Sequence, residues 1–160
     1  MPRLKDFDYS NKAVYITTKT WKNQKVFISD DRVNLIYESL DQIYNKYEFE
    51  INGFVIMPDH FHLIIVSQQN NLSDIMHDLK GKVASFMLKQ GIIKTKLWQK
   101  SFHNHVIRND KDLIKKLNYL HKNPLRAGLV KEPALYKYSS FKFYYEDGHK
   151  LPRWFKKIEI

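Results

Sequence analysis

The sequence predicts an α+β domain in which an antiparallel sheet carries helices on one face. Three observations support this prediction: strand-like and helix-like segments follow in the order β-α-β-β-α-β-α, hydrophobic residues make up 43% of the chain, and only 5 Gly and 5 Pro occur among 160 residues. A chain of this length and composition builds one globular core. The order of elements is the split β-α-β pattern of ferredoxin-like domains.

The first half of the chain supplies three strands and one helix. Residues 13–18 (AVYITT) are β-branched and aromatic, which is typical of a strand. Residues 49–57 (FEINGFVIM) and 60–66 (HFHLIIV) form two further strands, joined by a Pro-Asp dipeptide that suits a tight turn. Residues 30–47 are expected to form an amphipathic helix, because apolar side chains recur there at helical spacing, at Val33, Ile36, Leu40, Ile43 and Tyr47.

The second half of the chain continues the same alternation. Residues 72–90 show a second helical pattern, with one apolar side and one lysine-rich side. Residues 96–108 (KLWQKSFHNHVIR) are expected to form the fourth strand. Residues 110–123 are expected to form a third helix, which Pro124 stops because proline cannot continue a helix.

Basic residues are concentrated in the middle of the chain. The formal net charge is +10, and residues 78–126 hold 12 Lys and Arg against 3 Asp and Glu, a local net charge of +9. Aromatic residues make up 14% of the chain. A basic cluster of this size among many aromatic residues favours a polyanionic partner, most simply nucleic acid, over a merely solvated surface.

The composition excludes several classes of protein. The chain has no Cys, which rules out disulfides and thiolate metal sites. No window reaches the roughly 18 apolar residues of a membrane-spanning helix, and the N-terminal residues lack the apolar core of a signal peptide. We therefore expect a cytoplasmic protein with no membrane partner.

Two histidines, His60 and His62, begin an otherwise apolar strand. Residues i and i+2 of a strand point to the same face, so both imidazoles are expected to face one point, where they can bind a divalent metal. A hydrogen-bonded structural role for the pair stays open. A second pair, His103 and His105, has the same spacing but only the polar Asn104 between its members, and there a structural role is favoured.

The last predicted helix places Tyr119 away from its apolar face. At about 100° per residue, Tyr119 and Asn123 fall on the side that carries Lys115 and Lys116. A phenol in that position can attack phosphorus, and an amide oxygen one turn away can join two imidazoles around a metal. Because Asn123 precedes Pro124, helical geometry is disfavoured at its position and the one-turn spacing is approximate.

Four sequence blocks resemble the HUH single-tyrosine transposases of the IS200-like family, and most of all their REP-associated branch. The blocks are PDHFHLIIV, WQKSFHNHVIR, YLHKNPLRAGLV and YKYSS, and the resemblance runs from about residue 10 to residue 145. It implies that residues 1–130 form an HUH-type catalytic domain. Residues 131–160 would then be a basic, aromatic C-terminal extension packed on the same domain.

The resemblance also implies roles for individual residues. His60 and His62 would be metal ligands and Tyr119 the nucleophile, while Asn123 stands where the family places a third, amide-bearing ligand, Gln in many members. The implied cofactor is Mg²⁺ or Mn²⁺. The implied reaction is cleavage and transfer of single-stranded DNA through a 5′-phosphotyrosine, whose bond keeps the energy needed to reseal the strand.

Basic residues in the same part of the chain are expected to contact the DNA. Arg108 and Arg126 are preferred, because guanidinium groups suit phosphate and guanine and both residues fall within the family blocks. Lys115, Lys116 and Lys82 are expected to track phosphates.

Two functions stay open on the sequence: a DNA-cutting and joining enzyme, or a catalytically silent or domesticated protein that binds DNA hairpins. The presence of His60, His62 and Tyr119 together favours the enzyme, since a binding protein has no need of all three. An RNA-binding module is disfavoured, because no strand is rich in the aromatic residues on which such modules stack bases. The expected partner is single-stranded or hairpin DNA, bound by a monomer or a homodimer.

Overall fold

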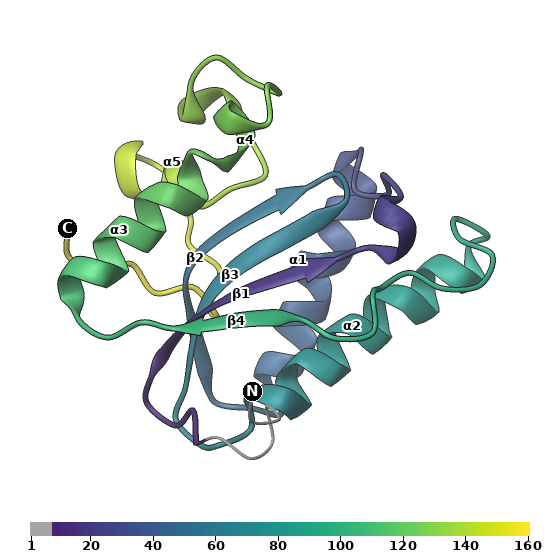
Figure 1. Cartoon of the computed structure of the whole chain (residues 1–160), viewed down its shortest axis with the longest axis horizontal. Coiled ribbons are helices and arrows are strands. Elements are labelled where there is room, and N and C mark those ends of the chain that lie inside the picture. The colour runs from purple at the N-terminus through teal and green to yellow at the C-terminus, as the bar shows by residue number, and fades with distance from the viewer. Residues whose placement is uncertain (1–7) are drawn as a thin grey trace.

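Four strands form one antiparallel sheet in the computed structural model, which describes residues 8–160 (Figure 1). The order across the sheet is β2-β3-β1-β4. The strands are β1 (Ala13–Lys19), β2 (Phe49–Met57), β3 (His60–Ser67) and β4 (His103–Val106). This architecture confirms the predicted α+β class with its antiparallel sheet. Residues 1–7, with which the expected catalytic domain begins, lie outside the described residues.

Two helices, α1 (Asp30–Tyr44) and α2 (Leu72–Lys89), lie side by side on one face of the sheet (Figure 1). Their inward side chains, such as Ile36 and Leu79, are fully buried. The first of these helices ends at Tyr44, before its predicted end at residue 47. Within residues 8–160, no helix has both the length and the apolar character needed to cross a membrane.

The third helix, α3 (Asp110–His121), lies against the opposite face, so the expectation of helices on one face holds for α1 and α2 alone. Adjacent residues of β2 point to opposite faces of the sheet. The Phe54 ring contacts Tyr37 of α1, with ring centres 5.5 Å apart, whereas Gly53 faces Leu117 of α3. A Cβ atom on Gly53 would lie 2.6 Å from Leu117 Cδ1. The glycine therefore permits the close approach of helix and strand.

The fourth strand is much shorter than predicted. Only His103–Val106 pairs with β1, and the upstream part of the predicted strand, residues 96–102, makes a single isolated bridge, from Trp98 to Thr20. Trp98 is buried, and its indole N–H donates to the Lys80 carbonyl at 2.9 Å. The prediction of one continuous strand over this segment was wrong. Around Trp98 the main chain still bonds to the end of β1, with the Gln99 amide donating to the Lys19 carbonyl at 2.9 Å, but the pairing does not continue through residues 100–102.

The predicted third helix is broken near its end. α3 ends at His121, and a separate short turn, α4 (Asn123–Arg126), follows. Proline lacks the backbone N–H that a helix interior needs but fits a first helical turn, so Pro124 starts α4 instead of extending α3. Tyr119 and Asn123 therefore do not share one continuous helix.

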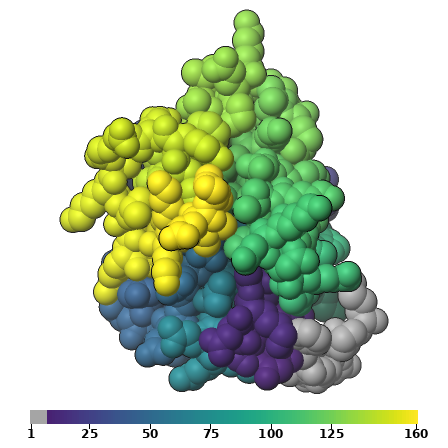
Figure 2. All heavy atoms as spheres, turned by 90° about the vertical axis from the view of Figure 1, so that its left-hand side faces the viewer, coloured from purple at the N-terminus to yellow at the C-terminus, as the bar shows by residue number. Residues whose placement is uncertain are grey.

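The C-terminal residues 131–160 lie along the outer edge of β2. Isolated bridges join Val55 to Ser139 and Ile51 to Phe155. In Figure 2 the end of the chain (yellow) adjoins α3 (green) on one face of the molecule. The segment thus provides hydrogen-bond partners for some of the main-chain N–H and C=O groups that an edge strand leaves unpaired. Its short helices are η3 (Pro133–Leu135) and α5 (Phe141–Tyr145).

Gly53→Ala is expected to destabilise the protein, because the added Cβ atom must displace the buried Leu117 side chain. We expect the free energy of unfolding to fall by about 1–3 kcal/mol, measured by urea denaturation followed by circular dichroism. Gly81→Ala is the matched control, since a Cβ atom there meets nothing within 4 Å on the exposed side of α2. That change should stabilise the helix by up to about 1 kcal/mol. Equal effects at both sites would contradict the close packing of α3.

Candidate active site

His60 and His62 begin β3 and present neighbouring imidazoles on the α3 side of the sheet, with ring centres 4.9 Å apart. His60 Nδ1 lies 2.6 Å from Asp59 Oδ1, and His62 Nδ1 lies 2.9 Å from Thr17 Oγ1. With Nδ1 of each ring engaged, Nε2 is the nitrogen that each ring can present to an ion. In metal sites, a hydrogen bond to the ring nitrogen that does not bind the metal orients each ligating histidine.

The His62 imidazole is neutral at physiological pH. Burial, followed by the charges of His60 and Arg126, lowers its pKa from 6.5 to about 3. Only 7% of the residue is exposed. A neutral imidazole keeps the lone pair that metal coordination requires, so protons compete for this ring only in strongly acidic solution.

The two imidazoles fit a divalent ion as part of a ligand set. Across residues 8–160, no three His, Asp or Glu side chains gather closely enough to hold a metal. An amide oxygen, water or an oxygen of the substrate can complete such a ligand set. Asn123, the expected amide, is half-buried at the start of α4, and its main-chain carbonyl accepts a hydrogen bond from the Ala127 amide at 3.0 Å.

Tyr119 lies near the end of α3 with 52% of its surface exposed. This exposure agrees with the helical periodicity, which places the residue outside the core. The Arg126 guanidinium carbon stacks 3.7 Å from the centre of the Tyr119 ring, and Arg126 Nη2 donates to the Tyr119 carbonyl at 2.7 Å. A cation suited to phosphate is thus fixed beside the phenol.

Tyr15 connects the histidines with Tyr119, and the sequence reasoning missed it. Its ring centre lies 5.2 Å from that of His62 and 6.4 Å from that of Tyr119. Its hydroxyl is buried and has no hydrogen-bond partner within the described part of the chain, and burial raises the pKa of the phenol above its ordinary value. Strand alternation puts Tyr15 and Thr17 on one face, but only the register with β3 identifies that face as the histidine face.

Three of the five predicted DNA contacts lie around the tyrosines. Lys115 and Arg126 line, with Tyr119, a hollow of about 530 Å³ beside α3. Lys116 Nζ lies 6.0 Å from the centre of the Tyr15 ring. These cations give the surface around the two tyrosines a positive charge, to which phosphate groups are attracted.

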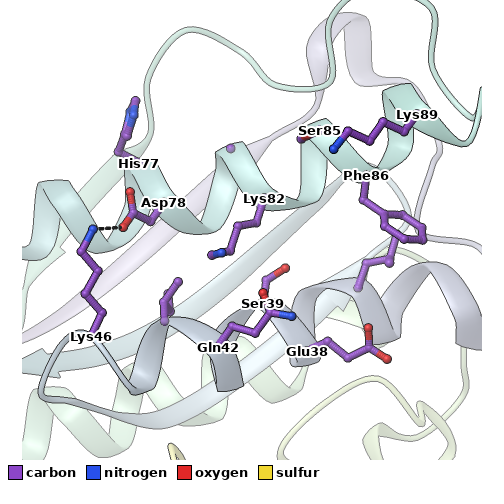
Figure 3. A pocket seen from close by; sticks show the side chains of 13 residues that line it. Glu38, Ser39, Gln42, Lys46, His77, Asp78, Lys82, Ser85, Phe86 and Lys89 are labelled. Atoms are coloured by element: carbon purple, nitrogen blue, oxygen red, sulfur yellow. Dashed lines mark hydrogen bonds and ion pairs between the residues drawn. The ribbon is translucent and has the colours of Figure 1, made fainter.

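The other two predicted DNA contacts lie apart from Tyr119. Arg108 lies two residues before Asp110, the first residue of α3, which is itself about 14 Å from Tyr119 along the helix at 1.5 Å per residue. Lys82 belongs to α2, on the other helical layer, and points into a groove against α1 (Figure 3). The fold therefore separates Lys82 from the histidines.

The second histidine pair lies on the edge strand. His103 and His105 pair across the strands with Thr17 and Tyr15, so they share the face of the candidate site. His105 Nε2 lies 3.3 Å from Asp112 Oδ2, at the start of α3. The structural role that the sequence favours for this pair stays a prediction.

Known proteins resemble the chain over most of its length. Residues 10–123 match the family model described as "Transposase IS200 like". A Haemophilus influenzae protein named as a candidate REP-associated tyrosine transposase is 28% identical over 145 residues, which cover 84% of this chain and 82% of the relative. The Escherichia coli REP-associated tyrosine transposase is 26% identical over 138 residues, which cover 81% of either chain.

The fold is shared with a solved structure of a REP-associated tyrosine transposase bound to a REP hairpin. The TM-score is 0.75 at 21% identity, and the match covers 89% of this chain and 84% of that one. Identity at this level supports the fold alone. The family match, by contrast, extends from β1 through α3 and includes His60, His62 and Tyr119. The chain therefore belongs to the IS200-like transposases, a family of DNA-transposing enzymes.

Proposed function

We propose that this transposase cleaves single-stranded DNA with Tyr119 as the nucleophile and rejoins it from a covalent 5′-phosphotyrosine. One observation carries the proposal: the exposed phenol of α3 lies on the same face of the sheet as the His60–His62 pair, with Tyr15 in contact with both parts. The shared face would let the nucleophile and the phosphate-binding groups approach one substrate position, as covalent catalysis requires.

The proposed reaction exchanges one phosphodiester for another. The Tyr119 hydroxyl oxygen attacks the scissile phosphorus, and the bond from phosphorus to the 3′-oxygen breaks. The phenolic proton leaves to solvent, and the departing oxygen takes up a proton to become a 3′-hydroxyl. A second 3′-hydroxyl then attacks the phosphotyrosine, which restores the phenol and joins the strand without ATP.

The metal ligands in this proposal are His60, His62 and Asn123. An amide oxygen and the substrate's own oxygens are hard donors suited to Mg²⁺ or Mn²⁺. A bound divalent ion would supply Lewis-acid polarisation of the phosphoryl group. Asp59 and Thr17 would hold the two imidazoles in orientation through their Nδ1 atoms.

The proposed substrate is single-stranded or hairpin DNA. Lys115, Lys116 and Arg126 surround the tyrosines, and Arg108 would extend the basic track past the start of α3. The REP hairpin bound by the similar solved structure favours a hairpin as the natural target of this chain. All the proposed catalytic groups belong to one chain, so a monomer suffices for cleavage, and a homodimer would carry two such sites.

We assign catalysis to residues 1–130 and a supporting role to the extension, residues 131–160. The support for this division is that the chemistry-bearing side chains all precede residue 131, whereas the extension contacts β2 and the end of α3.

Tyr119→Phe is expected to abolish covalent attachment to DNA. Phenylalanine keeps a ring on which Arg126 can stack, but it has no oxygen to attack phosphorus. The measurement is denaturing electrophoresis of the protein after incubation with Mn²⁺ or Mg²⁺ and end-labelled single-stranded DNA from hairpins that flank its gene. A protein–DNA adduct should form with the unaltered protein and disappear in the variant.

The matched control for this experiment is Tyr145→Phe, because Tyr145 is 51% exposed on α5 and Tyr119 is 52% exposed on α3. That variant should keep the adduct, and a chelator should remove it. An adduct that survives Tyr119→Phe would assign the nucleophile to another residue. Tight hairpin binding with no adduct under either metal would instead identify a hairpin-binding protein without cleavage activity.

Thr17→Val is expected to weaken divalent-metal binding by roughly 10- to 100-fold, the usual effect of removing a group that orients a ligating histidine. Valine keeps the shape of the side chain but removes the oxygen that holds His62 Nδ1. Mn²⁺ titration followed by electron paramagnetic resonance measures the change.

The adjacent Thr18 offers a matched control. It is fully buried, and its hydroxyl has no hydrogen-bond partner among the residues that the structure describes. Thr18→Val should therefore leave Mn²⁺ affinity unchanged. Equal affinity of both variants and the unaltered protein would mean that Thr17 does not orient a metal ligand.

A further inference from the structure

Trp21 is an exposed tryptophan in the loop that joins β1 to α1. It begins η2 (Trp21–Asn23), and 39% of its surface is exposed, whereas Trp98 and Trp154 are buried. A single exposed apolar residue needs no functional explanation by itself. Trp21 differs from such a residue in the contacts of its loop and in the charges around its ring.

The main chain of the loop is fixed on both sides of the Trp21 side chain. The backbone amide of Trp21 donates to the Leu97 carbonyl at 2.7 Å. Lys22 and Asn23 each have a φ of 53°, in the left-handed region that residues other than glycine rarely adopt. Such conformations persist where surrounding contacts enforce them, and they occur often at binding sites.

The same loop is joined to the candidate metal site through Asp59. The Thr20 N–H and hydroxyl donate to the Asp59 carbonyl at 2.9 and 3.0 Å, while the Asp59 carboxylate contacts His60 Nδ1. In Figure 1 the purple turn that follows β1 lies beside the turn between β2 and β3. Trp21 is therefore anchored at the end of the sheet where the histidines begin.

Two lysines give this aromatic surface a positive charge. Lys96 Nζ lies 4.2 Å from the centre of the Trp21 ring, and Lys22 Nζ lies 5.9 Å from it. Proteins that bind single-stranded nucleic acid combine an aromatic ring, on which a base stacks, with cations that follow the backbone. The ring and its cations offer both elements at one position.

Another exposed aromatic residue with lysines nearby lacks this connection. Phe86 is 44% exposed in the groove of about 590 Å³ between α1 and α2, with Lys82 and Lys89 (Figure 3). The same groove holds the ion pair of Lys46 with Asp78. It belongs to the two helices that cover the face of the sheet opposite α3, so it serves as an internal control.

We propose that Trp21, with Lys96 and Lys22, is a stacking platform for one unpaired base of the DNA strand next to the scissile phosphate. This inference rests on the proposed function and adds a binding subsite to it. The base lies on the indole ring, and the lysine ammonium groups pair with the neighbouring phosphates. The subsite selects for an unpaired base but discriminates little among the four bases, because every base has a π face.

The test measures binding without cleavage, in the presence of a chelator, by the anisotropy of a labelled single-stranded oligonucleotide. Trp21→Ala should weaken binding by about 5- to 150-fold, the effect of losing one stacked base. Trp21→Phe should keep most of the affinity, and Trp21→Leu should behave like Trp21→Ala, since leucine is apolar but has no π face. Circular dichroism checks that each variant folds.

Fluorescence provides a second readout. Because Trp98 and Trp154 are buried, a base that stacks on Trp21 should quench part of the protein's emission, and Trp21→Phe should lose that quenching while it still binds. Lys96→Gln should reduce the salt dependence of binding by about 0.7 in the logarithmic slope, as expected for one phosphate contact. Phe86→Ala and Lys89→Gln are the matched controls and should bind as the unaltered protein does.

The outcomes separate this inference from the function on which it rests. Unchanged affinity in Trp21→Ala, or an equal loss in Phe86→Ala, overturns the platform, even if the unaltered protein forms the adduct with DNA. Full affinity in Trp21→Leu overturns stacking as its mechanism. A third outcome supports the platform and overturns the cleavage reaction. In that case DNA quenches the emission of the unaltered protein and Trp21→Ala selectively loses affinity, but no adduct forms under any metal.

Discussion

The close packing of α3 against β2 determines the geometry of the candidate site. Because Gly53 has no side chain, Leu117 and Leu120 of α3 reach down to the sheet. Tyr119 lies between these two leucines in the sequence, so the turn of the helix directs it away from the contact. Its ring then meets Tyr15, which in turn contacts His62. The absence of one side chain on a strand thus sets how the phenol relates to the imidazoles.

The C-terminal extension holds the same helix from another direction. His121 Nε2 lies 2.8 Å from Ser140 Oγ, and the Ser140 amide donates to the Phe54 carbonyl at 2.9 Å. Burial lowers the pKa of His121 to about 4, so this ring is neutral in the contact. The end of α3 is therefore joined to both the extension and β2 by buried hydrogen bonds, which are strongest in such surroundings.

Local sequence patterns identified most of the fold, and long-range pairing decided the rest. Periodicity located α1 and α2, and continuous apolar runs located β2 and β3, because each pattern reflects burial of a single segment. The face that α3 covers follows instead from its contact with Gly53, which no pattern within the helix reveals. The fourth strand was overestimated because the apolar residues near its predicted start do not all face the sheet: only residues 103–106 pair continuously with β1, and the Trp98 indole bonds to the Lys80 carbonyl of a distant helix.

The candidate site shows the same division between local and long-range information. His60, His62 and Tyr119 could be singled out by residue type and spacing, and their catalytic roles stay predictions. Tyr15 could not be identified, because its importance depends on the register between β1 and β3, whose paired residues Thr17 and His62 are 45 positions apart. Trp21 was missed for a similar reason: its loop is fixed by contacts to residues of two other segments.

The attachment of α3 to both the sheet and the extension has an entropic consequence. Fixing the backbone of one residue costs about 1–2 kcal/mol of conformational entropy, and for Tyr119 this loss occurs when the protein folds. Only the side-chain torsions of Tyr119 are left to be restricted when a DNA strand binds. An attacking group that is already ordered lowers the activation free energy of the step that follows. Part of the entropy cost of placing the phenol against the phosphate is thus met during folding, before DNA binds.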